Sequence, residues 1–87
     1  GEKYWGAVAA LLNAVAEKRG WEHYSHRDYA VAIGRLYEET GDERLVADFH
    51  MAEALHANFY HSFMGRRRFD LHRRAVLELV ERLRRLL

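Results

Sequence analysis

The sequence predicts an all-α fold, a small antiparallel four-helix bundle. Three observations favour this class. Apolar residues recur at intervals of three and four along four segments, and no segment alternates apolar and polar residues as an amphipathic strand does. The short breaks between the segments hold glycine, serine or aspartate, which end or cap helices. With 87 residues, the chain is expected to be a single helical-bundle domain, residues 1–87.

The N-terminal half is expected to form two helices separated by Gly20. The first runs from about Lys3 to Arg19, and the second from Ser25 to Thr40. Ser25 and Asp28 make a near capping box, in which aspartate takes the place of the usual glutamate or glutamine. The apolar stripes comprise Trp5, Val8, Leu12 and Val15 in the first helix, and Tyr29, Ile33 and Leu36 in the second.

The C-terminal half is expected to form a third helix, capped by Asp42 and reaching about Met64, and a fourth that starts near Asp70. Gly65 stops the third helix. Because the apolar stripes are wide for so short a chain, we expect a homodimer to complete the core. The stripes comprise Leu45, Phe49, Ala52, Phe59 and Phe63 in the third helix, and Val76, Leu79, Val80, Leu83 and Leu87 in the fourth.

The composition argues against several function classes. Without cysteine the chain has no disulfide framework and no thiolate chemistry. No run of about 18 apolar residues could span a membrane, and no signal peptide opens the chain, so a cytoplasmic location is expected. The sequence has no nucleophile paired to a base, no phosphate-binding glycine loop and no dinucleotide fingerprint. We therefore expect no cofactor, no metal and no ordinary hydrolase, kinase or dehydrogenase activity.

Charge is unevenly distributed along the chain. Residues 1–43 carry five basic and eight acidic groups, whereas residues 44–87 carry nine and five. The basic excess gathers before and within the start of the fourth helix, where Asp70 is a lone carboxylate. Such a surface either contacts the phosphates of RNA or is simply solvated. The candidate nucleic-acid-binding residues are Arg66, Arg67, Arg68, Arg73 and Arg74.

His56 falls on the inward face of the third helix, among apolar residues. On a helical wheel it lies in the arc that contains Phe49 and Ala52, where an unpartnered imidazole would be costly. Glu53 and Tyr60 lie on the edge of this arc, so the three polar side chains can form a ladder. One interpretation is a core histidine hydrogen-bonded to a tyrosine, to Glu53 or to His26. The Glu53-x2-His56 spacing also occurs in di-iron bundles, but those need a second copy of the motif.

Six short segments carry a family resemblance by their order and spacing: residues 4–10, 16–21, 25–27, 36–37, 41–42 and 54–60. Together they resemble the archaeal PaREP family, which belongs to the wider HEPN-like group of helical bundles. The resemblance implies an antiparallel bundle, with a further helix ahead of this chain's first residue in longer relatives. Some members of the wider group look like metal-independent ribonucleases, and others are non-catalytic partners of small nucleotidyltransferases.

The ribonuclease site of that group is an arginine followed, after four to six residues, by a histidine, assembled across a dimer. Arg67 and His72 have this spacing, and Arg66 gives its longer form. A guanidinium can hold the scissile phosphate while an imidazole moves a proton on the ribose hydroxyl. The group's motif has a polar residue directly after its arginine and lies early in a helix. Here Arg68 follows, and the helix is expected to begin only at Asp70, so both features count against catalysis.

A nucleotide pocket is a further hypothesis for the two helices that carry histidines. Arg27 would take a phosphate at the start of the second helix, where free backbone N–H groups favour anions. Three functions therefore stay open: a module that binds RNA, a nucleotide or a nucleotidyltransferase-type partner protein; a metal-independent ribonuclease using Arg67 and His72; and a structural dimerisation unit of a longer protein. The candidate ligand-binding residues are Ser25, His26, Arg27, Glu53, His56 and Tyr60.

Overall fold

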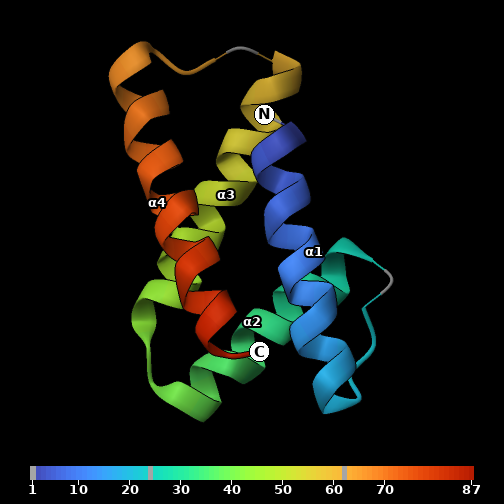
Figure 1. Ribbon diagram of the computed structural model, residues 1–87. Helices are drawn as coiled ribbons and strands as arrows, with labels where there is room; N and C mark the ends of the chain where they lie inside the picture. The colour runs from blue at the N-terminus through green and yellow to red at the C-terminus, as the bar shows by residue number, and fades with distance from the viewer. Residues whose placement is uncertain (1, 24, 62) are drawn as a thin grey trace.

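The computed structural model confirms the all-α class (Figure 1). The structure describes residues 2–23, 25–61 and 63–87, apart from the side chains of Glu2, Phe59, Tyr60 and His61. Within these residues it contains the helices α1 (Glu2–Arg19), α2 (His26–Thr40), α3 (Glu43–His61) and α4 (Arg66–Arg85). None of the helices in the described part of the chain combines the length and apolar character that crossing a membrane requires.

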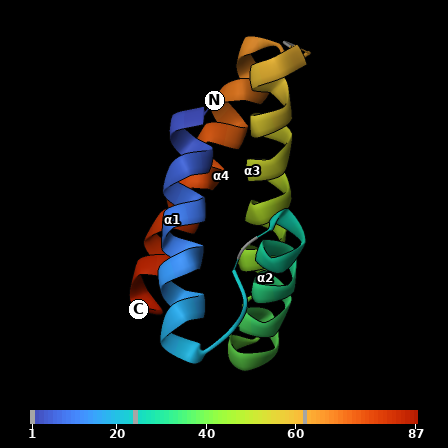
Figure 2. The same cartoon turned by 90° about the vertical axis from the view of Figure 1, so that its right-hand side faces the viewer.

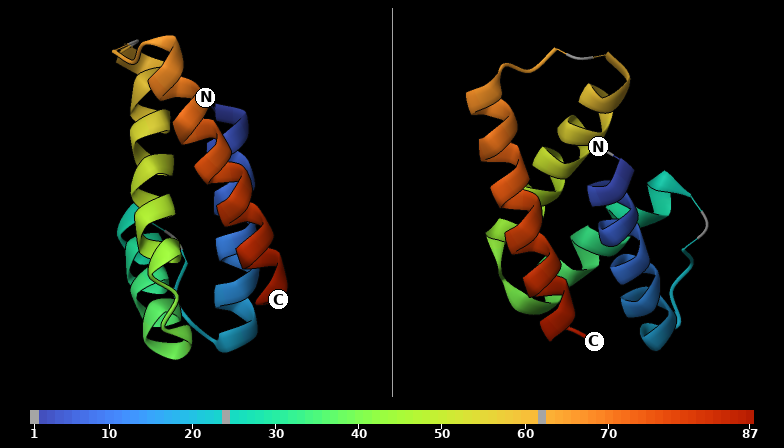
Figure 3. Two further views of the ribbon diagram at one scale, coloured as in Figure 1. Left: turned by 90° about the vertical axis from the view of Figure 1, so that its left-hand side faces the viewer. Right: turned by 45° about the horizontal axis from the view of Figure 1, so that its top comes forward.

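The four helices form a bundle in which α3 contacts each of the other three. α1 and α4 lie side by side and run in the same direction, and α3 runs opposite to both (Figures 1 and 2). α2 is inclined to the others and packs on α1 and α3. The start of α4 lies at the end of the bundle where α3 finishes, and the end of α1 lies at the opposite end (Figure 3).

The core takes side chains from all four helices and confirms most of the predicted stripes. Leu79 and Leu83 of α4 are fully buried inside this single chain, so their burial does not depend on a second copy. Each buried leucine contributes about 1.5–3 kcal/mol relative to an exposed one. The buried members of the predicted stripes are Val8, Leu12, Val15, Ile33, Leu36, Leu45, Phe49, Ala52, Val76, Leu79 and Leu83.

Local signals fix the start and the end of α2 as predicted. The Ser25 hydroxyl accepts the Asp28 N–H at 3.2 Å, and the Asp28 carboxylate accepts the Ser25 N–H at 3.1 Å, so the capping box forms. Gly41 ends the helix with a left-handed φ of 71°, which glycine adopts without steric cost. Asp42 then accepts the Arg44 N–H at 3.0 Å and starts α3.

The predicted boundaries around Gly65 were wrong. α3 ends at His61 rather than near Met64, and α4 begins at Arg66 rather than near Asp70. The side-chain amide oxygen Oδ1 of Asn58 accepts the Met64 N–H at 2.8 Å and so holds the chain outside α3, while Gly65 becomes the extended N-cap of α4. Because Phe63 therefore lies outside the helix, its predicted core position is also wrong, and its exposed fraction is 47%. Leu87, beyond α4, is exposed to the same extent.

Candidate functional site

The first turn of α4 concentrates positive charge. It holds three exposed arginines, residues 66–68, and no acidic residue, and its N-cap Gly65 has no side chain to accept the free N–H groups. A helix N-terminus is itself partially positive, so the backbone and the guanidinium groups reinforce one another. Arg73 and Arg74 follow on the same helix. In the described part of the chain, no carboxylate forms an ion pair with any of these five arginines.

An exposed aromatic ring lies beside these arginines. The Arg68 guanidinium stands 5.8 Å from the centre of the Phe63 ring, which is 47% exposed. We call Phe63 and the five arginines the α4 patch. Arginines that contact phosphates, together with an aromatic face on which a base can stack, are typical of surfaces that bind single-stranded nucleic acid.

His72 lies one turn after Arg68 and has a defined hydrogen bond. Its Nδ1 donates to the Arg68 carbonyl oxygen at 2.7 Å. Because a carbonyl oxygen only accepts, this bond places a proton on Nδ1 and leaves Nε2 for proton transfer. Arg67 and His72 both lie in the first two turns of α4. Since α4 begins at Arg66, the pair lies early in a helix, and that part of the argument against catalysis is removed.

Trp5 of α1 brings together the histidines of α2 and α3. The rings of His26 and His56 stack on its indole, each with ring centres 4.9 Å apart. The Glu53 carboxylate holds two imidazoles, since His26 Nε2 lies 2.6 Å from one oxygen and His50 Nδ1 lies 3.2 Å from the other. The predicted proximity of His26, Glu53 and His56 is therefore present, with Trp5 as the shared contact that the sequence did not indicate.

The cluster of Trp5, His26, Glu53 and His56 serves to pack α1, α2 and α3 against one another. The half-buried His56 ring covers an indole, and His26 bridges α2 to α3 through Glu53. The side chain of Tyr60, the remaining member of the predicted ladder, lies outside the described residues. Ser25 is committed to the cap of α2. Across the part of the chain that the structure describes, no group of three or more His, Asp or Glu side chains is placed to hold a metal ion.

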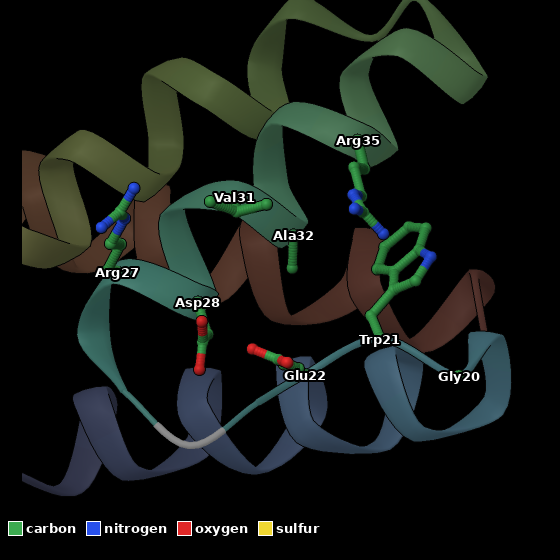
Figure 4. A pocket seen from close by; sticks show the side chains of 8 residues that line it. All are labelled: Gly20, Trp21, Glu22, Arg27, Asp28, Val31, Ala32 and Arg35. Atoms are coloured by element: carbon green, nitrogen blue, oxygen red, sulfur yellow. The ribbon is translucent and has the colours of Figure 1, made fainter.

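Arg27 lines a different surface from His26 and His56. It borders a groove of about 510 Å³ between residues 20–22, which follow α1, and one face of α2 (Figure 4). Trp21 and Arg35 stand at one end of this groove and Arg27 at the other. The structure therefore does not assemble Arg27 with the two histidines into one pocket.

The comparisons with known proteins decide the family. The sequence matches the profile of the archaeal PaREP1/PaREP8 family over residues 1–80. The chain belongs to this family. Neither the curated proteins nor the solved structures give a significant match. The description of the PaREP1/PaREP8 family names no reaction and no ligand, so the chemistry of this member rests on its own side chains.

Asp48 is a buried acidic residue of this PaREP1/PaREP8 member that the sequence analysis missed. Its side chain is fully buried between α3 and α4, with Arg82 Nη1 at 3.1 Å and Arg44 Nη2 at 3.4 Å. Burial raises the pKa of the Asp48 carboxyl, although both guanidinium groups lower it. The helical wheel held the signal, because Asp48 falls between Ala52 and Leu55 on the apolar arc of α3.

Proposed function

We propose that this chain is a non-catalytic RNA-binding module and that the α4 patch is its contact surface. One observation carries the proposal: the five arginines at the start of α4 have a single acidic neighbour, Asp70, and in the described structure none of them forms an ion pair with a carboxylate. Four other arginines do have carboxylate partners, namely Arg19, Arg44, Arg82 and Arg84. The five arginines of the α4 patch have none in the described structure, so an external anion is the partner that would offset their charge.

RNA carries both kinds of group that this surface can bind, namely phosphates and flat bases. Backbone N–H groups at the start of α4 and the guanidinium groups of residues 66–68 would bind phosphates, while Phe63 offers a face for one base. Contacts of this kind read the backbone and stacking rather than the sequence, so we expect weak sequence preference. The choice of RNA over DNA rests on the resemblance to the HEPN-like group.

Fluorescence anisotropy with a labelled single-stranded RNA in EDTA, repeated over a series of salt concentrations, tests this proposal. If all five arginines contact phosphates, log K should fall with log salt with a slope of about −3.5, since each contact on a single strand contributes about −0.7. The triple variant R66Q/R67Q/R68Q should keep a slope of only about −1.4 and bind at least about tenfold more weakly.

A double variant at the other end of the same helix provides the matched control. R84Q/R85Q also removes cations from α4 but lies far from the patch, so it should keep the wild-type salt slope. Equal losses in the two variants would mean that net charge, and not the α4 patch, determines binding. Binding that does not respond to salt would overturn the proposal.

A metal-independent ribonuclease is the second candidate, and the His72 hydrogen bond favours it. With Nδ1 held by the Arg68 carbonyl, His72 Nε2 could take the proton from a ribose 2′-hydroxyl as that oxygen attacks phosphorus and the bond to the 5′-oxygen breaks. Arg67 would hold the phosphate. Incubation with RNA in EDTA, beside R67A and H72A, separates the two functions on a gel. Cleavage that both folded variants lose supports the ribonuclease, whereas a shift without cleavage supports the binding module.

A homodimer remains part of both proposals. Leu71 and Leu77 are the large apolar side chains of α4 that the single chain leaves most exposed, at 48% and 44%. Light scattering of the wild type and of L71E would measure the mass in solution. A dimer that L71E dissociates while the helical content is kept supports an interface on α4, and a monomeric wild type removes it.

A further inference from the structure

The groove beside Trp21 has an apolar floor and charged ends. Val31 and Ala32 of α2 form the floor, and Val31 is 48% exposed although it faces a concave surface (Figure 4). Arg27 and Arg35 lie at the two ends, eight residues and therefore about 12 Å apart along the helix. Four of the eight lining residues are charged, so the groove offers a small apolar floor surrounded by polar groups that can orient a polar ligand.

Three of the four charged side chains that line this groove, Glu22, Arg27 and Arg35, have no partner carboxylate or hydrogen bond in the described structure, whereas Asp28 belongs to the capping box of α2. In the described structure Arg27 and Glu22 take part in no hydrogen bond or ion pair, and Arg35 contacts only the Trp21 ring, at 5.2 Å. Arg19, which also lies over that ring at 5.7 Å, is instead fixed by two hydrogen bonds to Glu39. The groove therefore retains binding groups that the fold does not use.

The arrangement of these groups restricts the ligand. The side chains of Arg27 and Arg35 lie at opposite ends of the groove and do not converge on one point, so each end has a different partner in this arrangement (Figure 4). Because Arg35 already covers the Trp21 ring at 5.2 Å, a flat ring would stack on the other face of the Arg35 guanidinium, and Arg27, in the first turn of α2, suits a phosphate. Glu22 lies between them in Figure 4 and can accept hydrogen bonds from hydroxyl groups, as acidic residues do from ribose. Because Glu22 and Asp28 offset the two arginines, a bare anion gains little here.

We infer that this groove binds a nucleoside 5′-monophosphate. The base lies over Val31 against the face of the Arg35 guanidinium that is turned away from Trp21, Glu22 accepts hydrogen bonds from the ribose hydroxyls, and Arg27 holds the phosphate. The same chemistry is present in a free nucleotide and in the 5′-phosphorylated end of an RNA. The groove lies at the opposite end of the bundle from the α4 patch, so the inference does not rest on the proposed function (Figure 1).

Nuclear magnetic resonance titration of the full chain with adenosine 5′-monophosphate tests the inference. The indole N–H resonance of Trp21, assigned with W21F, should shift and saturate at millimolar ligand or below, and that of Trp5 should not move. Adenosine should bind about tenfold more weakly because it lacks the phosphate, and inorganic phosphate should leave the resonance unchanged. A 5′-phosphorylated trinucleotide that binds more tightly than the monophosphate assigns the groove to RNA ends, and weaker binding assigns it to free nucleotides.

Two variants locate the contacts. R27Q should weaken binding of the monophosphate about tenfold and leave the affinity for adenosine unchanged. E22Q should abolish the preference in binding for the ribonucleotide over its 2′,3′-dideoxy form. R66Q, on the α4 patch, is the matched control and should bind the monophosphate like the wild type. No shift of Trp21 at about 10 mM ligand, equal weakening by R27Q and R66Q, or a response to phosphate alone would overturn the inference. RNA binding lost in R66Q/R67Q/R68Q but kept in R27Q would still support the α4 patch.

Discussion

Replacing Arg82 with methionine should destabilise the bundle by about 3 kcal/mol. Arg82 of α4 lies 3.1 Å from the fully buried Asp48 carboxylate of α3 and also pairs with Asp42 and Glu78. Methionine keeps the apolar stem of arginine and removes its charge. The variant therefore isolates the electrostatic contribution and leaves most of the packing in place.

The magnitude follows from burial and from the partner that remains. Removing one member of a buried ion pair costs about 3–5 kcal/mol, because the other charge stays buried. The lower end applies here, since Arg44 still lies 3.4 Å from the second Asp48 oxygen and the Arg82 side chain is itself 28% exposed. In a domain of this size each kcal/mol moves the melting temperature by about 4–8 °C, so Tm should fall by about 12–24 °C.

The pH dependence gives a second, independent readout. Burial raises the pKa of the Asp48 carboxyl above 3.8, so the folded state binds this proton more readily than the unfolded state does. The contribution of this carboxyl to stability is therefore greatest below about pH 3.8 and falls as pH rises through the raised folded-state pKa. R82M removes one group that lowers this pKa, so the fall should extend to higher pH, and mild acidification should recover part of the lost stability.

Urea and thermal denaturation of the wild type, R82M and R85M make the comparison. Arg85 lies on the same helix, is exposed and has no carboxylate partner in the described structure, so R85M should change stability by less than about 0.5 kcal/mol. If R82M lowers the free energy of unfolding no more than R85M does, then Arg82 does not stabilise the buried Asp48 carboxylate. If acidification fails to narrow the gap between R82M and the wild type, the pKa argument is wrong.

Three further outcomes are expected. H56A should lower the free energy of unfolding, measured with urea, by about 1–2 kcal/mol, because the His56 ring stacks on the Trp5 indole. H50A, which removes an exposed imidazole, should lower it by less than about 0.5 kcal/mol. S25A should lose about 1 kcal/mol and lower the helical content, because it removes the cap of α2. Hydrogen bonds from Arg19 lower the pKa of the Glu39 carboxyl below 4.5. The contribution of this carboxylate to folding stability is therefore present above pH 4.5 and is lost as the pH falls through the folded-state pKa. In thermal melts recorded at a series of pH values, E39Q should lose less stability on acidification than the wild type.

The fold was predictable from the sequence wherever a signal was local. The capping box at Ser25 and the left-handed glycine at position 41 fix the ends of α2 through neighbours three or four residues away. The segment before α4 was not predictable in this way. There the Met64 N–H is accepted by Asn58 six residues back, and Gly65 caps α4 without any side chain that a motif could reveal. The predicted helix start at Asp70 was wrong for that reason.

The candidate sites were less accessible, because they depend on contacts between distant helices. The wheel placed His56 inward, but the ring that it covers belongs to Trp5, about fifty positions earlier. The same holds for Asp48, since its position on the apolar arc was readable but its partner Arg82, on another helix, was not. Arg27 precedes Asp28 of the capping box, and the motif gave no indication that Arg27 borders a groove with residues 20–22.

The arginines at the start of α4 lie where they should oppose folding, and this bears on the proposed function. Cations in the first turn of a helix are unfavourable by about 0.3–1 kcal/mol each at low ionic strength, and three of them stand there without acidic compensation. R66Q/R67Q/R68Q should therefore melt higher than the wild type, by about 4–8 °C for a gain of about 1 kcal/mol, while losing RNA binding. A lower melting temperature would show that these side chains hold the fold, and the loss of binding would then reflect unfolding. If the triple variant is more stable than the wild type but binds RNA more weakly, then the three arginines repel one another and the helix N-terminus in the free protein, and an anionic ligand relieves that repulsion.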